Sequence, residues 1–264
     1  MRRAPTAMIA LALLAFLAAC GGATHAPPKV SAGPGLHPGK ASGALTRSEA
    51  AAFARAVRLL PGDVPGFAPS RERQHPETAA ERRAGQALRA CIGAPAQAHS
   101  AARPSSEQGS LNYTREDGLG LQTISSSVEV LPSSVAASLE LEFVRKAHTR
   151  ACMASFLTSL LARLRLHGGS ISPVTVQPFN PSAQGTAGAF GWHVGATISI
   201  HGLKLALRFD LLGFAYRSAV VRLSDLGFPR IPEAQEQRLF ALLLARARNF
   251  PNEPPATPAA AQPA

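Results

Sequence analysis

Residues 190–211 decide the fold, with the sequence FGWHVGATISIHGLKLALRFDL. Every even position from 190 to 200 holds an apolar residue, and the odd positions between them hold glycines or polar residues. A period of two is typical of a β-strand with one buried face. His201-Gly202 predicts a turn, after which the alternation resumes from Leu203 to Leu211. We therefore expect a β-hairpin with one apolar and one polar face.

Further strands are expected on both sides of this hairpin. A turn at residues 213–218 leads into an alternating strand at 219–223. Upstream, residues 111–130 also alternate, but their phase changes near residues 122–123, which predicts a β-bulge. Residues 171–178 contain two prolines, and this pattern is typical of an edge strand.

Four helical segments surround the strands. Capping boxes open the segments at residues 46–60 and 78–93. Residues 133–166 carry two apolar stripes offset by one residue, so they form either two helices or one bent helix. A proline opens the last segment, residues 232–250. Because helices and antiparallel strands occur in separate blocks, we predict a single α+β domain over residues 46–250, an antiparallel sheet with helices packed on one face.

The first twenty residues have the pattern of a lipoprotein signal peptide. A short basic start precedes an apolar stretch of 13 residues at 7–19, which is too short to span a membrane. Leu17-Ala18-Ala19-Cys20 resembles the lipobox of bacterial lipoproteins. We expect cleavage after residue 19 and alkylation of the Cys20 thiol with a diacylglyceryl group, whose fatty acids, such as palmitate, would anchor the chain on the extracytoplasmic face of the cell membrane. The alternative is an ordinary secretory signal in which Cys20 occurs by chance.

The two ends of the mature chain lack hydrophobic periodicity. Residues 20–45 are rich in Gly, Pro, Ala and Ser and predict a disordered tether, and residues 251–264 predict a disordered Pro/Ala tail. Loss of Arg2 and Arg3 with the signal peptide lowers the formal net charge from +11 to +9. The anionic lipids and acidic polymers of an envelope are natural counter-charges for such a protein. No basic stripe is interleaved with aromatic residues, so we expect no nucleic-acid partner.

Two cysteines remain once Cys20 is acylated. Cys91 and Cys152 each lie on the apolar face of a predicted helix. In an oxidising compartment we expect them to form a disulfide, which would close a loop of about 60 residues and stabilise the fold by about 4 kcal/mol in the chain-entropy model. The alternative is two buried free thiols. A redox role is not expected, because the sequence has no Cys-x-x-Cys.

Five short motifs carry a resemblance to known proteins: DVPGF at 63–67, RAC at 89–91, SSSVEV at 125–130, RAC at 150–152 and DLLGF at 210–214. They resemble uncharacterised lipoproteins of actinobacterial type and, more distantly, the extracellular sensor domain of membrane serine/threonine kinases. The chain differs from that sensor domain in having one cysteine pair instead of two, and no kinase or spanning segment. The resemblance covers roughly residues 47–250. It implies an α+β sensor or ligand-binding domain and brings no catalytic residue with it.

Motifs of known chemistry are absent from the sequence. It has no Gly-x-Ser-x-Gly elbow, no His-Glu-x-x-His, no P-loop and no dinucleotide fingerprint. No pair of histidines has helical metal-ligand spacing, so we expect no metal and no cofactor. Asp63, Asp117 and Asp225 lie beside turn glycines, which indicates that they cap the backbone.

The polar face of the hairpin is the candidate ligand-binding face. Its members alternate along the two strands: His193, Thr197, Ser199, His201, Lys204, Arg208 and Asp210. This basic, hydroxyl-rich surface suits an anionic or glycan ligand, although a merely solvated face has the same pattern. The other candidate is an apolar pocket between helices and sheet, whose residues would equally form plain core. That pocket would be lined by Phe143, Phe156, Trp192 and Phe209.

These observations favour a lipid-anchored envelope protein without catalytic activity. It would bind a small ligand, an anionic envelope polymer or a partner protein. The alternative is an envelope hydrolase that uses Ser199 with His193 or His201, and it requires a cleft in which the two side chains lie within about 3 Å. A purely structural spacer is the third possibility.

Overall fold

The computed structural model of the chain describes residues 45–70, 79–92, 106–117, 120–162, 169–200, 202–228 and 230–250. The expected signal peptide, Cys20, nearly all of the tether and the C-terminal tail lie outside these ranges. No helix within them is long and apolar enough to cross a membrane.

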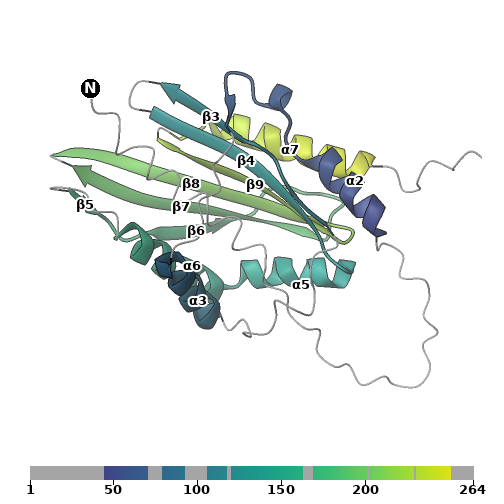
Figure 1. The fold of residues 1–264 in the computed structure, drawn as a ribbon, viewed down its shortest axis with the longest axis horizontal. Coiled ribbons are helices and arrows are strands. Elements are labelled where there is room, and N and C mark those ends of the chain that lie inside the picture. The colour runs from purple at the N-terminus through teal and green to yellow at the C-terminus, as the bar shows by residue number, and fades with distance from the viewer. Residues whose placement is uncertain are drawn as a thin grey trace, which may run out of the picture.

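The described strands form one antiparallel sheet, with the predicted hairpin inside it (Figure 1). Its order is β1-β3-β4-β9-β8-β7-β5, and in addition β2 pairs with β4 and β6 pairs with β7. The strands are β1 (Ala68–Ser70), β2 (Ser106–Gly109), β3 (Asn112–Asp117), β4 (Gly120–Val130), β5 (Gly169–Ile171), β6 (Thr175–Phe179), β7 (Gly188–Ile200), β8 (Leu203–Tyr216) and β9 (Ala219–Phe228). The hairpin predicted from residues 190–211 corresponds to β7 and β8, which are paired along their whole length.

Helices cover both faces of this sheet (Figure 1). The helices are α2 (Arg47–Val57), α3 (Ala79–Ile92), α5 (Ser134–Arg145), α6 (Ala147–Leu161) and α7 (Glu233–Asn249), with a short 3₁₀ helix η1 (Pro61–Asp63). Helices α3, α5 and α6 lie on one side, here called the disulfide face. Helices α2 and α7 lie on the other, here called the α7 face.

The predicted α+β class and antiparallel sheet are confirmed, but the expectation that helices pack on one face is wrong, because a second helical layer covers the other face. The second layer forms because, in the paired ends of β8 and β9, successive residues are buried on both faces of the sheet. Leu211 packs in the core of the disulfide face, whereas Leu212 and Phe214 pack in the core of the α7 face. A sheet that is apolar on both faces has to be covered on both.

Local signals account for the helix ends. The capping box at the start of α2 is present: the Thr46 hydroxyl accepts from the Glu49 N–H, and the Glu49 carboxylate accepts from the Thr46 N–H at 2.7 Å. The segment at 133–166 forms two helices, because the chain leaves the helical conformation at Lys146 (φ −62°, ψ 137°). The second predicted capping box, at residues 78–81, begins outside the described residues.

Two local predictions are wrong. Strand β4 has no bulge at residues 122–123, since its pairing with β9 is continuous from Leu121 to Val130. Its change of phase arises because side chains are buried on both faces of this central strand. The turn predicted at 213–218 is only Arg217-Ser218, because β8 continues to Tyr216.

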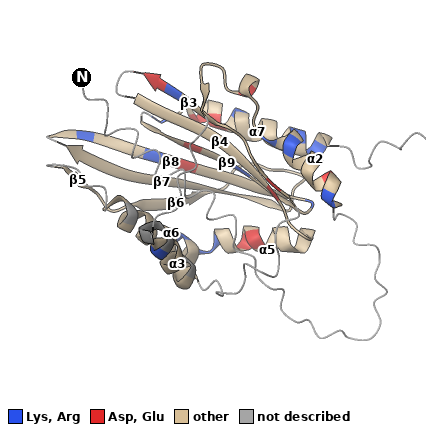
Figure 2. Cartoon of the chain, viewed as in Figure 1, with Lys and Arg blue, Asp and Glu red and all other residues tan. Residues whose placement is uncertain are grey.

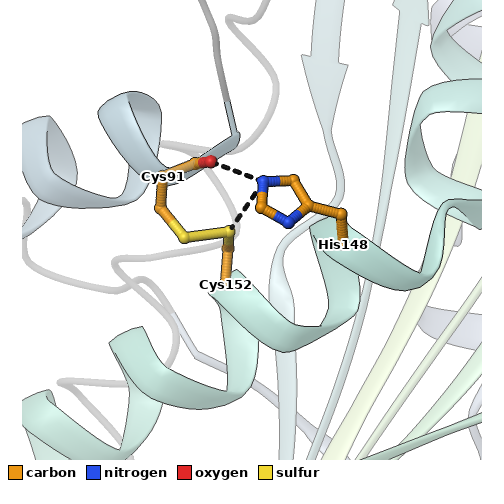
Figure 3. Close-up of side chains that lie close together, drawn as sticks. All are labelled: Cys91, His148 and Cys152. Carbon is orange, nitrogen blue, oxygen red and sulfur yellow. Dashed lines mark hydrogen bonds between the residues drawn. A yellow bond between two sulfur atoms is a disulfide. The ribbon is translucent and has the colours of Figure 1, made fainter.

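Cys91 of α3 and Cys152 of α6 form the predicted disulfide, with sulfurs 2.02 Å apart (Figure 3). It fastens the outer helix α3 to α6. His148 lies beside it, with Nε2 2.7 Å from the Cys91 carbonyl oxygen and 3.7 Å from Cys152 Sγ. The imidazole thereby satisfies a carbonyl in the last turn of α3. These three side chains are close enough to hold a metal, but the disulfide consumes both thiolates that a metal would need.

Candidate functional site

A row of three ionisable side chains crosses the α7 face of the sheet. Strand pairing places His193 of β7 opposite Asp210 of β8, and Asp210 opposite Asp225 of β9. His193 Nδ1 lies 2.8 Å from Asp210 Oδ1, and its N–H donates a hydrogen bond to that carboxylate oxygen. Two aspartates directly opposite each other on neighbouring strands repel. The row therefore requires further positive charge.

The N-terminal end of α7 adds two charged side chains to this row. Glu236 lies in the first turn of α7, and its side chain is buried. Arg230, in the segment before the helix, places Nε 3.0 Å from Asp210 Oδ2 and Nη2 3.4 Å from Glu236 Oε2. Oxygens of the three carboxylates lie within 4.8 Å of one another. We call these five side chains the Asp225 cluster: His193, Asp210, Asp225, Arg230 and Glu236.

Asp225 is the poorly compensated member of the cluster. Asp225 is 2% exposed, and neither of its carboxylate oxygens has a hydrogen-bond partner among the described residues. Burial, followed by repulsion from Asp210 and Glu236, raises the pKa of Asp225 to about 8. Burial and Asp210 likewise raise the pKa of Glu236 to about 7. At neutral pH the cluster therefore retains protons unless a cation replaces them.

The edge strand β6 fixes the position of His193. The Phe179 ring stacks on the imidazole, with ring centroids 4.0 Å apart and planes 6° from parallel. Gly191 makes room for this ring, since a Cβ at that position would lie 2.5 Å from Phe179 ring carbons. With Phe179 on its ring face and Asp210 on Nδ1, His193 is held as an orienting partner of Asp210.

The disulfide face buries a second charged group, here called the Arg222 cluster (Glu129, Glu140 and Arg222). Arg222 of β9 donates to Glu129 of β4 at 3.0 Å and to Glu140 of α5 at 3.1 Å. Burial raises the pKa of Glu129 to about 6, and it also raises the pKa of Glu140, although Arg222 opposes both shifts. Each carboxylate here has a hydrogen-bonded guanidinium partner.

The structure divides the predicted ligand-binding face into two parts. His193 and Asp210 belong to the Asp225 cluster, under α7. The other described members lie at the end of β7 and in the first half of β8: Thr197, Ser199, Lys204 and Arg208. This end of the hairpin extends past α7 (Figure 1). The two hydroxyl residues are half-buried and the two cations are exposed, toward the free end of β8 (Figure 2). We call these four residues the hairpin surface; His201 lies outside the described residues.

The structure does not bring His193 and Ser199 together. They are six residues apart on β7, which separates them by about 20 Å at about 3.3 Å per residue. The hydrolase alternative that pairs His193 with Ser199 therefore lacks the required geometry. Its other form, with His201, lies outside the described residues.

The aromatic residues expected to line a pocket are core residues. Phe143, Phe156, Trp192 and Phe209 are all buried. The cavity beside them, between α6 and the sheet, is lined by residues such as Leu157 and Phe209 and has a volume of about 10 Å³. That is room for about one water molecule. A larger apolar ligand would have to open the core.

The sequence prediction that Asp225 caps a turn is wrong, because β9 continues through Gly227 to Phe228. Asp63 does act as a cap, accepting from the Leu60 N–H at 2.6 Å. The pairing of Asp210 with Asp225 has a signal in the sequence, since residues equidistant from a two-residue turn lie opposite each other. That signal depends on locating the turn at 217–218. Glu236 and Arg230 carry no such signal, because only the docking of α7 brings them to the row.

The chain matches no known protein family and no curated protein. Its fold is weakly similar to two solved structures. The extracellular domain of PknH from Mycobacterium tuberculosis aligns with a TM-score of 0.41 at 9% identity, over 78% of this chain and 98% of that one. LpqN, involved in cell envelope biogenesis of Mycobacterium tuberculosis, aligns with a TM-score of 0.23 at 14% identity, over 53% of this chain and 66% of that one. Because both similarities are weak, function has to be inferred from the chain's own residues.

Proposed function

We propose that this chain is a lipid-anchored envelope protein whose hairpin surface binds an anionic component of the envelope, without catalysing a reaction. The observation that carries the proposal is the hairpin surface itself. Lys204 and Arg208 are exposed beside two hydroxyl side chains, on a part of the sheet that no described helix covers. Exposed cations on a rigid sheet attract anionic polymers and headgroups, and neighbouring hydroxyls can donate to their oxygens.

Features elsewhere in the chain support the proposed location. The lipobox-like Leu17-Ala18-Ala19-Cys20 supports acylation of Cys20. The Cys91–Cys152 disulfide supports an oxidising compartment, since such bonds persist outside the cytosol. The excess of basic over acidic residues fits a surface of anionic lipid and polymer.

Mass spectrometry of the chain isolated from its native membrane tests the anchor. We expect an N-terminus at Cys20 carrying acyl chains, and we expect Cys20→Ser to abolish both the acylation and the cleavage. Recovery of an unmodified polypeptide that begins at Met1 would refute the anchor.

Charge reversal at the hairpin surface tests the binding. A chain that begins at Gly21 should sediment with phosphatidylglycerol vesicles and not with phosphatidylcholine vesicles. The Lys204→Glu/Arg208→Glu variant should lose this binding. A matched control, Arg47→Glu/Arg55→Glu, changes the net charge equally at two exposed positions of α2 and should retain it. Equal losses in both variants would show a non-specific charge effect and refute a hairpin site.

A further inference from the structure

The Asp225 cluster holds more negative charge than its described partners neutralise. When ionised, its three carboxylates carry three negative charges, against one positive charge on Arg230. His193 reaches Asp210 through Nδ1–H, a bond that neutral imidazole makes without adding charge. The balance that remains is two negative charges, which equals the charge of one divalent cation.

We propose that Asp210, Asp225 and Glu236 bind one divalent cation of the size of calcium. Three carboxylates from β8, β9 and α7 supply only oxygen ligands, which are the ligands that hard cations such as Ca²⁺ prefer. No thiolate or free imidazole nitrogen faces this point among the described residues, which disfavours zinc and copper.

The spacing of the oxygens fits calcium. All three ligand oxygens lie within 4.8 Å of one another. Ca²⁺–oxygen distances of about 2.3–2.6 Å allow ligands on opposite sides of the ion to be up to about 5.2 Å apart, so all three oxygens can reach one ion. Mg²⁺ requires near-ideal octahedral geometry and gives up its water reluctantly, which a buried site with three side-chain ligands does not suit. Calcium also tolerates irregular geometry, so water can complete a shell that three side chains leave open.

Asp225 gives an observation independent of the clustering. Its carboxylate is buried, points into the cluster, and makes no hydrogen bond with any described residue. Buried polar atoms are nearly always partnered in folded proteins, so Asp225 is an exception that a bound ion would account for. The strand register holds Asp225 opposite Asp210, which keeps its side chain on the buried α7 face of the sheet.

The surroundings of the three carboxylates provide support and an entrance. His193, which stacks against the Phe179 ring, fixes the orientation of Asp210, as partners of metal-binding carboxylates commonly do. Arg230 is at the rim of the cluster, where 33% of its side chain is exposed. Extracellular calcium sites commonly have dissociation constants of about 0.1–1 mM, and we expect this range here.

Equilibrium dialysis of the full chain with ⁴⁵Ca²⁺, after treatment with a chelator, tests the site. We expect one ion bound per chain, weaker binding of Mg²⁺, and a higher unfolding midpoint in millimolar Ca²⁺ than in chelator. Asp225→Asn should lose at least tenfold in affinity and lose the calcium-dependent shift of the midpoint. Asp117→Asn, the same change at an exposed aspartate at the end of β3, is the matched control and should keep both.

Three results would overturn the proposal. The first is no binding by the unaltered chain at millimolar Ca²⁺ together with an unchanged midpoint, which would mean that protons alone neutralise the cluster. The second is an affinity in Asp225→Asn equal to that of the unaltered chain. The third is a preference for Mg²⁺, which would contradict the argument from irregular coordination geometry. Glu236→Gln, a change on a different element, gives an independent variant should Asp225→Asn fail to fold.

Discussion

Strand β9 carries one member of each buried charged cluster, on opposite faces of the same sheet. Arg222 points to the disulfide face, where it donates to two glutamates. Asp225 points to the α7 face, where it lies among carboxylates; among the described residues, Arg230 forms ion pairs with Asp210 and Glu236 and Asp225 has no hydrogen-bond partner. The difference teaches that the position of the arginine decides the outcome. A buried arginine between two glutamates gives each carboxylate a hydrogen-bonded partner, so no ligand is needed there. An arginine at the rim beside three carboxylates leaves one of them, Asp225, without a partner among the described residues.

The largest expected difference between the clusters is the effect of removing each arginine. Arg222→Met should destabilise the chain by about 3–5 kcal/mol, because it leaves Glu129 and Glu140 buried without a counter-charge. Arg230→Met should cost less, about 1–2 kcal/mol, because this side chain is one-third exposed and Glu236, whose pKa is already raised to about 7, can take up a proton in its place. Urea unfolding at neutral pH measures both losses. Equal losses would contradict the comparison.

Removing the unpartnered carboxylate should stabilise the chain when no calcium is present. In chelator at pH 7, Asp225→Asn should raise the free energy of unfolding by up to about 4 kcal/mol, at about 1.4 kcal/mol for each pH unit between pH 3.8 and pH 7. The raised pKa means that folding at this pH has to bury a charge or take up a proton, and asparagine requires neither. The gain should disappear near pH 3.8, where the carboxyl is protonated in the unfolded chain as well. A loss of stability at pH 7 would count against an unpartnered Asp225.

The Arg222 cluster also makes the stability of the chain depend on pH. The pKa of Glu129 rises from 4.5 in the unfolded chain to about 6 in the fold, so its contribution is most favourable below pH 4.5. Stability falls by about 2 kcal/mol as the pH rises from 4.5 to 6, because the folded chain holds the proton more tightly. The groups that face Glu129 are Arg222, Glu140 and Glu107. Subtracting the pH profile of Glu129→Gln from that of the unaltered chain should isolate this slope, and identical profiles would contradict it.

The smallest expected effect concerns the support for His193. Gly191→Ala should push the Phe179 ring off the imidazole and destabilise the chain by about 1 kcal/mol. Gly195→Ala is a matched control on the same strand, since a Cβ there would meet only the Thr175 hydroxyl at 3.3 Å. Thermal unfolding compares the two variants. A larger loss in Gly195→Ala would show that Phe179 is not the constraint.

Much of the fold could be predicted from local patterns. The alternation in residues 190–211 predicts β7 and β8, the capping box predicts the start of α2, and the two cysteines left after Cys20 predict the disulfide. The strand and capping signals are local to a few residues, and the disulfide follows because only two cysteines remain to pair. The second helical layer could not be predicted so easily, because the doubly buried ends of β8 and β9 have no single period.

The Asp225 cluster was harder to predict than the fold. His193 and Asp210 stood out because they alternate with apolar residues on adjacent strands. The role of Asp225 was missed because the nearby Gly227 suggested a turn, whereas both residues lie within strand β9. Glu236 and Arg230 meet the row only through the packing of α7 on the sheet, a tertiary contact that no local pattern encodes. The hairpin surface stays a prediction as a binding site.

A crystal of the full chain soaked in strontium, a divalent cation that resembles calcium and scatters anomalously, tests the contrast between the clusters most directly. We predict one anomalous peak between Asp210, Asp225 and Glu236, and none between Glu129, Glu140 and Arg222. A peak in the Arg222 cluster, or no peak at Asp225 at millimolar strontium, would contradict the conclusion that one site is open to a cation and the other closed.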